Sequence, residues 1–495
     1  MTMSSSTSSR RPLTPGQSRR LRLLALLFLI ISADVLLLGL QPGINLFVFA
    51  NLVSAVLLIV ARAHLSRLQR AGCLLLSLAA TTPLLEQASW MGIAIALAAL
   101  AVVALTAAGL MPTQRTRIPA TILRFFLAIP GRVRRAPSRV MGQGRQQVTS
   151  SHLWSQIKAW IIPVGLACGF LTLFSIANPM IGILFDHLSI DLLLRLFDLD
   201  RIGLWIVVGV LGGALLRPHL QHITIRRRCD ASLNVLFGEA MLLRSLALFN
   251  VVFALQTGLD LTYLWGGAEL PAHMSYARYA HRGAYPLIVT ALLAAVFVLA
   301  AMRPGGPGSR SRLIRGLVYL WIAQNVLLCL SAMLRLDLYV EIYSLTELRL
   351  AAGIWMGLVA TGLLLILLRI RFNQSNAWLV SLSSIALATV LFVSALADLP
   401  AFIARFNVEH SREISGKGLP LDLFYLRELG PSALPALDTY IAAVETMAGP
   451  QRDLARDIRS RLAYAVLRRP DDWRSWTFRK ARQNAYILLT APVAR

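Results

Sequence analysis

Apolar blocks of roughly twenty residues recur along most of this chain, and they constrain its fold more than any other feature of the sequence. A helix of about that length crosses the hydrocarbon core of a bilayer, which is ~30 Å thick. Hydrophobic residues make up 56% of the chain and charged residues only 15%, against about 25% charged residues in a typical globular domain. This composition excludes a soluble enzyme and predicts a membrane protein that crosses the bilayer many times.

We count about eleven such blocks, each long enough to cross the membrane as a helix. The first, at residues 21–40, is too long for a signal peptide and lacks a small-residue cleavage site, so we interpret it as a span. The stretch 71–110 is too long for one span and is interrupted by Pro83 and Glu86, which predicts two helices. The remaining spans are predicted at residues 44–60, 159–177, 202–216, 236–259, 285–302, 313–334, 350–368 and 378–397.

The distribution of arginine between the loops predicts the orientation of these spans. Residues 111–158 carry eight arginines and no acidic residue, which is typical of a cytoplasmic loop. With the N-terminus in the cytoplasm, the arginine clusters at 217–228, 303–315 and 369–371 fall on the same side. An odd number of spans then places the C-terminus outside.

The chain has a formal net charge of +25, and its basic residues cluster in the loops between spans. We therefore expect the lipid bilayer and its anionic headgroups as partners, and no nucleic acid. The arginine- and alanine-rich usage is typical of a high-GC bacterial genome, and the chain is expected to cross a bacterial membrane several times.

The predicted fold class is all-α: a polytopic transmembrane helical bundle with a small C-terminal extracytoplasmic helical domain. In that domain, charges of both signs alternate, and amphipathic helices are predicted from Pro431 and over 451–468, with Trp473 and Trp476 closing the core or seating it at the lipid surface. The predicted segments are a disordered cytoplasmic tail (1–20), four transmembrane helices (21–111), a basic cytoplasmic loop (112–158), seven transmembrane helices with an interfacial helix at 180–200 (159–397), and the extracytoplasmic domain (398–495).

The sequence carries no catalytic signature. It contains no HExxH, P-loop, GxSxG or glycine-rich dinucleotide motif. Its four cysteines lack the spacing of a zinc site. Asp198 and Asp200 form a DxD pair that is better interpreted as a solvated helix end than as a ligand of a sugar-diphosphate cation. We therefore expect no catalytic residue, no metal and no cofactor.

Three ionisable residues fall within predicted spans, where charges are costly and are functional candidates. Asp34 lies past the midpoint of the first span, and Glu239 and Arg244 begin the seventh. If the seventh span starts near Ser232, Arg244 reaches the depth of Asp34 and can neutralise it. If it starts near Ala240, Arg244 snorkels to the surface and Glu239 faces the cytoplasm. A proton or ion relay through Asp34, or its solvation in a polar crevice, are the other interpretations.

The densest polar groups lie in two predicted outer loops, before the eighth span and between the ninth and tenth. Arginine and tyrosine together at an outer interface are typical of a headgroup belt. The sharper hypothesis is one pocket for an anionic lipid or carbohydrate headgroup. Its candidate binding residues are Arg278, His281, Arg282, Tyr339, Tyr343, Thr346, Glu347 and Arg349.

At these residues the sequence resembles known families. The stretch 276–285, the run from Arg335 through Tyr339 to Arg349, and Asp472–Trp476 are similar to the bacterial polytopic membrane families catalogued as domains of unknown function 4173 and 4153. The resemblance covers residues 178–495, and these families commonly have glycine where Ser344 stands. It implies a bacterial inner-membrane protein and no particular activity.

Two classes of function remain. The favoured hypothesis is a non-enzymatic envelope sensing or scaffolding component, with an envelope protein partner bound through residues 398–495. The alternative is a transporter or lipid-handling protein that uses Asp34 and the outer Arg/Tyr cluster, and it requires a polar path from the outer loops to mid-membrane.

Overall fold

The computed structural model describes residues 15–61, 65–114, 117–142, 199–218, 239–266, 311–444, 450–469 and 472–490. These residues are helical throughout, with no strand among them. Seven of the described helices are long and apolar enough to cross a membrane. The predicted all-α class and membrane character are confirmed at this level. The spans predicted at 159–177 and 285–302 and the interfacial helix at 180–200 lie outside the described residues.

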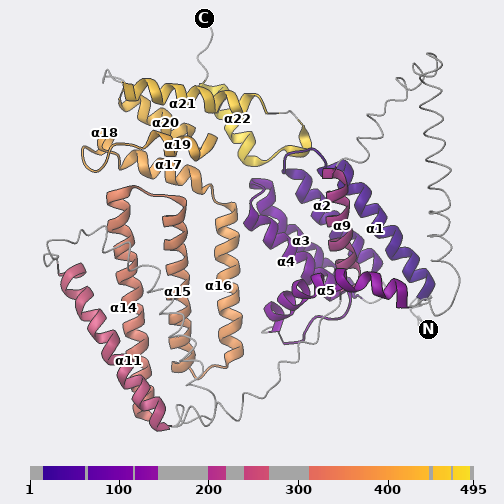
Figure 1. Cartoon of the computed structure of the whole chain (residues 1–495), viewed down its shortest axis with the longest axis horizontal. Helices are drawn as coiled ribbons and strands as arrows, with labels where there is room; N and C mark the ends of the chain where they lie inside the picture. Colours follow the sequence, from indigo (N-terminus) through magenta and orange to yellow (C-terminus); the bar gives the residue numbers. More distant parts are fainter. Residues whose placement is uncertain are drawn as a thin grey trace, which may run out of the picture. The chain divides into compact units, whose positions relative to one another are not determined.

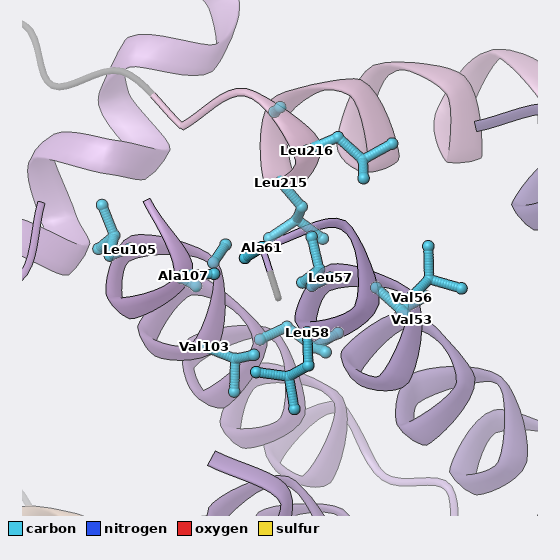
Figure 2. Packing of buried hydrophobic residues seen from close by; sticks show 14 of the residues in the cluster. Val53, Val56, Leu57, Leu58, Ala61, Val103, Leu105, Ala107, Leu215 and Leu216 are labelled. Carbon is cyan, nitrogen blue, oxygen red and sulfur yellow. The ribbon is translucent and has the colours of Figure 1, made fainter. Parts of the chain in front are cut away.

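The described helices fall into two compact units. The first unit contains α1 (Pro15–Leu37), α2 (Ile44–Val60), α3 (Arg67–Glu86), α4 (Trp90–Ala107), α5 (Ile118–Gly142) and α9 (Leu199–Leu216). Its core is aliphatic: Leu57 and Leu58 of α2, Val103 of α4 and Leu215 of α9 belong to one buried cluster, and Figure 2 shows them converging. Close packing of such side chains holds the six helices together.

The interruption predicted within residues 71–110 is confirmed. Helix α3 ends at Glu86 and α4 begins at Trp90, with Pro83 in the last turn of α3. Proline lacks a backbone N–H, so Pro83 removes one helical hydrogen bond near the end of α3 and weakens the last turns of the helix. Helix α3 also has a capping box, in which the Ser66 side chain accepts from Gln69 N–H and the Gln69 side chain accepts from Ser66 N–H.

Two boundaries differ from the prediction. Helix α1 begins at Pro15, within the predicted disordered tail, because proline is favoured at the first position of a helix. Most of the predicted basic loop is helix α5 (Ile118–Gly142). Its apolar residues recur at helical spacing, and Phe125 and Ala128 are each only 1% exposed. Burial of that apolar face stabilises a segment whose arginines look like a loop in sequence.

The second unit contains α11 (Glu239–Asp260), which continues as a short π-helical turn, η2 (Leu261–Trp265), and three further long helices. These are α14 (Arg312–Tyr343), α15 (Glu347–Arg371) and α16 (Asn376–Leu396). Helix α14 packs against both α11 and α15, and α15 packs against α16. Its 32 residues extend past the predicted end at 334, giving a length of about 48 Å, well beyond the hydrocarbon core.

A helical domain follows α16 directly. Its helices are α17 (Leu399–Glu409), α18 (Arg412–Ser415), α19 (Leu423–Glu428), η3 (Gly430–Ala433), α20 (Leu434–Ala443), α21 (Pro450–Leu467) and α22 (Phe478–Thr490). The amphipathic helices predicted from Pro431 and over 451–468 are confirmed as α20 and α21. Leu437 of α20 and Ile458 of α21 share one buried cluster with Ile403 of α17. Figure 1 shows α17 lying across the ends of α14 and α15.

The last helix completes this domain. Ile487 is buried in the same cluster, and Tyr486 donates a hydrogen bond to Asp438 Oδ2 at 2.9 Å. Asp438 also pairs with Arg459, whose Nε lies 2.7 Å from Oδ1, so the carboxylate joins α20, α21 and α22. Trp473 and Trp476 are 64% and 37% exposed, so the prediction that they close the core is wrong, and their placement at a lipid surface stays a prediction.

Candidate functional site

The turn between α14 and α15 is conformationally unusual. Ser344 has φ 63° and ψ 168°, a combination populated almost only by glycine and costing other residues about 1–3 kcal/mol. This is the position at which the resembling families carry glycine. The tight turn therefore forms here with serine, and the surrounding contacts must hold the strained backbone in place.

Arg349 supplies the first of these contacts. Its Nη1 donates to the carbonyl oxygen of Tyr343 at 2.5 Å and to that of Ser344, so it satisfies carbonyls that the end of α14 leaves open. The guanidinium carbon lies 4.5 Å from the centre of the Tyr339 ring and 5.7 Å from that of Tyr343. Three of the predicted binding residues thus come together, and Arg349 acts as a cap on α14.

Thr346 and Glu347 belong to the same turn. The Thr346 hydroxyl accepts from the backbone N–H of Arg349 at 3.4 Å and so caps α15. The backbone N–H of Glu347 donates to the Tyr425 hydroxyl of α19 at 3.0 Å. Burial raises the pKa of the Tyr425 hydroxyl, so this hydroxyl stays protonated to a higher pH than a free tyrosine.

Between these caps, Leu345 is held by the C-terminal domain. Its N–H donates to Asn407 Oδ1 at 2.7 Å, and its carbonyl accepts from Asn407 Nδ2 at 2.9 Å. Asn407 is 6% exposed and Leu345 is 7% exposed. Leu345 and Val340 are part of the domain's own buried cluster. The turn is therefore a structural component of the domain, and sequence reasoning did not identify Asn407 because a lone asparagine has no local signature.

A second attachment lies at the end of α16. Asp398 caps α17 by accepting from the N–H of Ala401 at 3.2 Å, and its Oδ2 lies 3.3 Å from Arg479 Nε. Arg479, on α22, is 6% exposed and also donates to the carbonyl of Ala397 at 3.1 Å. The final helix is thus bonded to the residue that follows the last span.

In the first unit, Asp34 is neutralised by Arg201. Arg201 of α9 donates from Nε to Oδ1 at 2.7 Å and from Nη2 to Oδ2 at 2.5 Å. Trp205 Nε1 donates to Oδ1 at 3.0 Å. The carboxylate of Asp34 is therefore occupied by Arg201, in place of the hypothesised Arg244.

The other intramembrane candidates lie on α11. Helix α11 begins at Glu239 in the described part of the chain, and the side chains of Glu239 and Arg244 are both exposed. This geometry agrees with the alternative in which Arg244 snorkels. Asp200, from the DxD pair, is exposed in the first turn of α9, which agrees with a solvated helix end, and Asp198 lies outside the described residues.

A second ion pair joins α11 and α14. Asp260 Oδ1 contacts Arg335 Nη2, and the two side chains are 1% and 4% exposed. Gln256 Nε2 donates to the same carboxylate oxygen at 2.9 Å. Arg335, the first residue of the run that resembles known families, is thus part of a buried ion pair within the bundle.

The remaining predicted binding residues, Arg278, His281 and Arg282, lie outside the described residues, and their convergence with Arg349 stays a prediction. No group of three or more His, Cys, Asp or Glu side chains suited to a metal ion occurs in the described part of the chain. The arrangement around Ser344 thus offers caps and packing contacts that connect two helices to a domain.

A match to a known family covers most of these helices. Residues 73–440 match the family described as a domain of unknown function, DUF4153. The match begins in α3, earlier than the resemblance at 178, and ends in α20, so the motif at Asp472–Trp476 lies beyond it. No curated protein and no solved structure matches the chain. Because the match covers more than half of the sequence, including the turn at Ser344, the chain belongs to the DUF4153 family.

Proposed function

We propose that this protein is a non-enzymatic envelope component of the sensing or scaffolding kind, which holds its C-terminal helical domain in a fixed orientation on the membrane bundle. The observation that carries this proposal is the pair of hydrogen bonds between Asn407 and Leu345. Both groups are buried, so the attachment excludes water and is stronger than a surface contact.

Two separate attachments support a fixed domain. One is at the Ser344 turn, and the other is the bond from Arg479 to the carbonyl that follows α16. A domain held at two points cannot swing as it would on a flexible linker. Whatever binds the domain therefore acts on α14, α15 and α16 together.

Helix α14 connects this attachment to the opposite end of the unit. It runs without interruption from Arg312 to Tyr343, and it contacts α11 through the Asp260–Arg335 pair. A displacement of the domain would move the turn, and through α14 it would reach the opposite end of the unit. This connection fits a sensor, in which α14 transmits the binding of a partner. It also fits a scaffold that holds a partner in position.

The proposed location is the bacterial inner membrane, with the N-terminus in the cytoplasm and the C-terminal domain outside. The arginine distribution supports this orientation. In the first unit, Arg20 and Arg22 stand in the first turns of α1, Arg67 begins α3, and Arg217 follows α9. These ends belong to the same side if the helices alternate in direction and the predicted span at 159–177 is counted between α4 and α9. The proposed partners are anionic headgroups and an envelope protein bound to the domain.

A complementation experiment tests the proposal. In a strain lacking the gene, the full chain should restore the resistance of the envelope to detergent. The variants Asn407→Ala and Arg479→Met should insert at normal levels and fail to restore it, because both loosen the domain from the bundle. The matched control is Thr439→Ala, which removes only a bond within α20. Full complementation by both variants would reject the proposal and indicate that the membrane-spanning helices carry the function.

The alternative function, a transporter or lipid-handling protein, draws less support from the residues first assigned to it. Asp34 is occupied by Arg201, and Arg349 caps α14. Its specific support comes instead from the polar side chains buried between α11 and α14.

A further inference from the structure

Three side-chain amides are buried on α11 and α14, two helices that pack against each other. Asn250 of α11 is 6% exposed, and Gln324 and Asn325 of α14 are 8% and 2% exposed. Asn250 lies near the middle of the described part of α11 (Glu239–Asp260), a helix long and apolar enough to cross a membrane. Polar groups in the middle of a membrane-spanning helix need partners within the protein.

The nitrogen of each amide has such a partner. Asn250 Nδ2 donates to the carbonyls of Leu246 and Leu317 at 2.8 and 3.1 Å. Gln324 Nε2 donates to the carbonyl of Asn250 at 3.2 Å, and Asn325 Nδ2 donates to that of Trp321 at 2.7 Å. A backbone carbonyl can only accept. These bonds therefore fix which end of each amide is nitrogen and which is oxygen.

The oxygen of each of these amides has no such partner in the described part of the chain. Within the described part of the chain, Asn250 Oδ1, Gln324 Oε1 and Asn325 Oδ1 are buried and accept no hydrogen bond. The hydroxyl oxygen of Thr257, two turns along α11 from Asn250, is in the same condition. A buried polar atom without a partner is costly and rare in folded proteins. Several of them at one interface require a common explanation.

Two amides in the first unit, one buried and one half-buried, have partners for both the oxygen and the nitrogen. Asn45 accepts from the N–H groups of Gly43 and Leu46 and donates to two carbonyls. Asn51 accepts from the Ser77 hydroxyl at 3.0 Å and donates to Thr81. The amides of the α11–α14 interface differ from these in lacking a donor for the oxygen.

Aromatic packing keeps the amides at one level of the bundle. The Trp321 ring stacks on Phe249 at 5.3 Å and meets the edge of Phe253 at 5.6 Å. Asn250 lies between these two residues on α11, and the next turn of α14 after Trp321 carries Gln324 and Asn325. The rigid rings thus fix the two amide-bearing turns against each other.

We propose that these amide oxygens bind a monovalent alkali cation within the membrane bundle. Uncharged carbonyl-type oxygens are ligands for hard cations. Calcium and magnesium sites in proteins ordinarily include carboxylates, and none of the three amide ligands is charged, so the site suits a single positive charge. In the filters of ion channels, several oriented oxygen dipoles likewise replace the water molecules around a single positive charge.

This site does not depend on the proposed scaffolding function, although α14 carries both the amides and the Ser344 turn. If both are correct, cation occupancy stiffens the helix that holds the domain. Failure of the complementation experiment would leave cation binding untouched. Failure of cation binding would likewise leave the attachment of the domain intact.

The test uses the purified full chain and its unfolding temperature in NaCl, in KCl and in N-methyl-D-glucamine chloride at equal ionic strength. At least one alkali salt should raise the unfolding temperature in a saturable way, because a ligand that binds the folded state stabilises it. Asn325→Leu, of similar shape, should weaken the apparent affinity by about tenfold or more. In the bulky organic salt this variant should be at least as stable as the wild type, because a costly buried oxygen is gone.

Asn51→Leu is the matched control. It removes an amide whose oxygen and nitrogen both have partners, so it should lower the unfolding temperature in every salt and leave the cation response unchanged. Direct binding of radioactive sodium and of rubidium, as a potassium substitute, to the wild-type chain provides a second measurement if Asn325→Leu does not fold. Equal unfolding temperatures in all three salts, or a cation response that survives in Asn325→Leu, would overturn the proposal and leave bound water as the partner of these oxygens.

Discussion

Asn407 and Leu345 exchange two hydrogen bonds, at 2.7 and 2.9 Å, although they are 62 positions apart in sequence. The asparagine side chain pairs with both backbone groups of one residue, as a neighbouring β-strand would. This side chain fastens α17 to the turn between α14 and α15. It also satisfies the backbone of the residue next to the strained Ser344.

Removing this amide should loosen the domain. Asn407→Ala leaves the N–H and the carbonyl of Leu345 buried without a partner, at a cost of about 2–4 kcal/mol in the free energy of unfolding. Hydrogen exchange of the Leu345 amide should become much faster than in the wild type. Thr439→Ala, on the exposed side of α20, should leave that rate unchanged. Equal protection of Leu345 in wild type and Asn407→Ala would show that the bond contributes nothing to the attachment.

Ser344 offers a substitution that should stabilise the protein. Its backbone, with φ 63° and ψ 168°, suits glycine, so Ser344→Gly should raise the free energy of unfolding by about 1–3 kcal/mol. Ser344→Ala keeps the Cβ atom and should bring no such gain. Denaturant unfolding of the three proteins in the same detergent measures the difference. A loss of stability in Ser344→Gly would mean that the serine side chain matters more than the strain.

The ion pair between Asp34 and Arg201 should appear as an energetic coupling. Asp34→Asn and Arg201→Gln should each destabilise the first unit, and the double variant should lose less than the sum, giving a coupling of about 1–3 kcal/mol. The matched control pairs Asp34→Asn with Arg244→Gln, whose effects should add. Additive effects for Asp34 and Arg201 would contradict the pairing.

The C-terminal domain should lose stability at high pH. Burial and the bond to Asp438 raise the pKa of Tyr486 to about 12, above the usual value near 10. The protonated hydroxyl therefore stabilises the folded state fully below pH ~10, and this contribution of about 2–3 kcal/mol is lost between about pH 10 and 12. Tyrosinate absorbance of the wild type minus that of Tyr486→Phe measures the titration. A difference spectrum that titrates near pH 10 would contradict the shift, and Tyr464→Phe, at an exposed tyrosine, is the control.

The membrane helices are the part of the fold that hydropathy predicts well. The bounds of α2, at 44–60, agree with the prediction, because Gly43 and the arginines after Val60 mark both ends of an apolar block. The end of α14 was misplaced because Arg335, Asp337 and Glu341 look like a polar loop in sequence. The structure continues the helix through them, since Asp260 neutralises Arg335 and the domain covers Val340.

The candidate site was predicted only where its residues are close in sequence. Tyr339, Tyr343 and Arg349 lie within three helical turns and were grouped correctly. Asn407 and Tyr425, which bond to Leu345 and Glu347 in the same turn, come from a domain that begins after two further helices. Composition gives no sign of such pairings. The pairing of Arg201 with Asp34 was missed for the same reason, because the two residues lie 167 positions apart.

A direct distance measurement tests the central claim that the domain is fixed to the bundle. Spin labels at Trp355 of α15 and Tyr464 of α21, which are 52% and 55% exposed, can be attached to the full chain in nanodiscs after its native cysteines are replaced by alanine. Double electron–electron resonance should give one narrow distance distribution for the otherwise wild-type chain and a broad one for Asn407→Ala. A broad distribution that Asn407→Ala does not change would contradict the account.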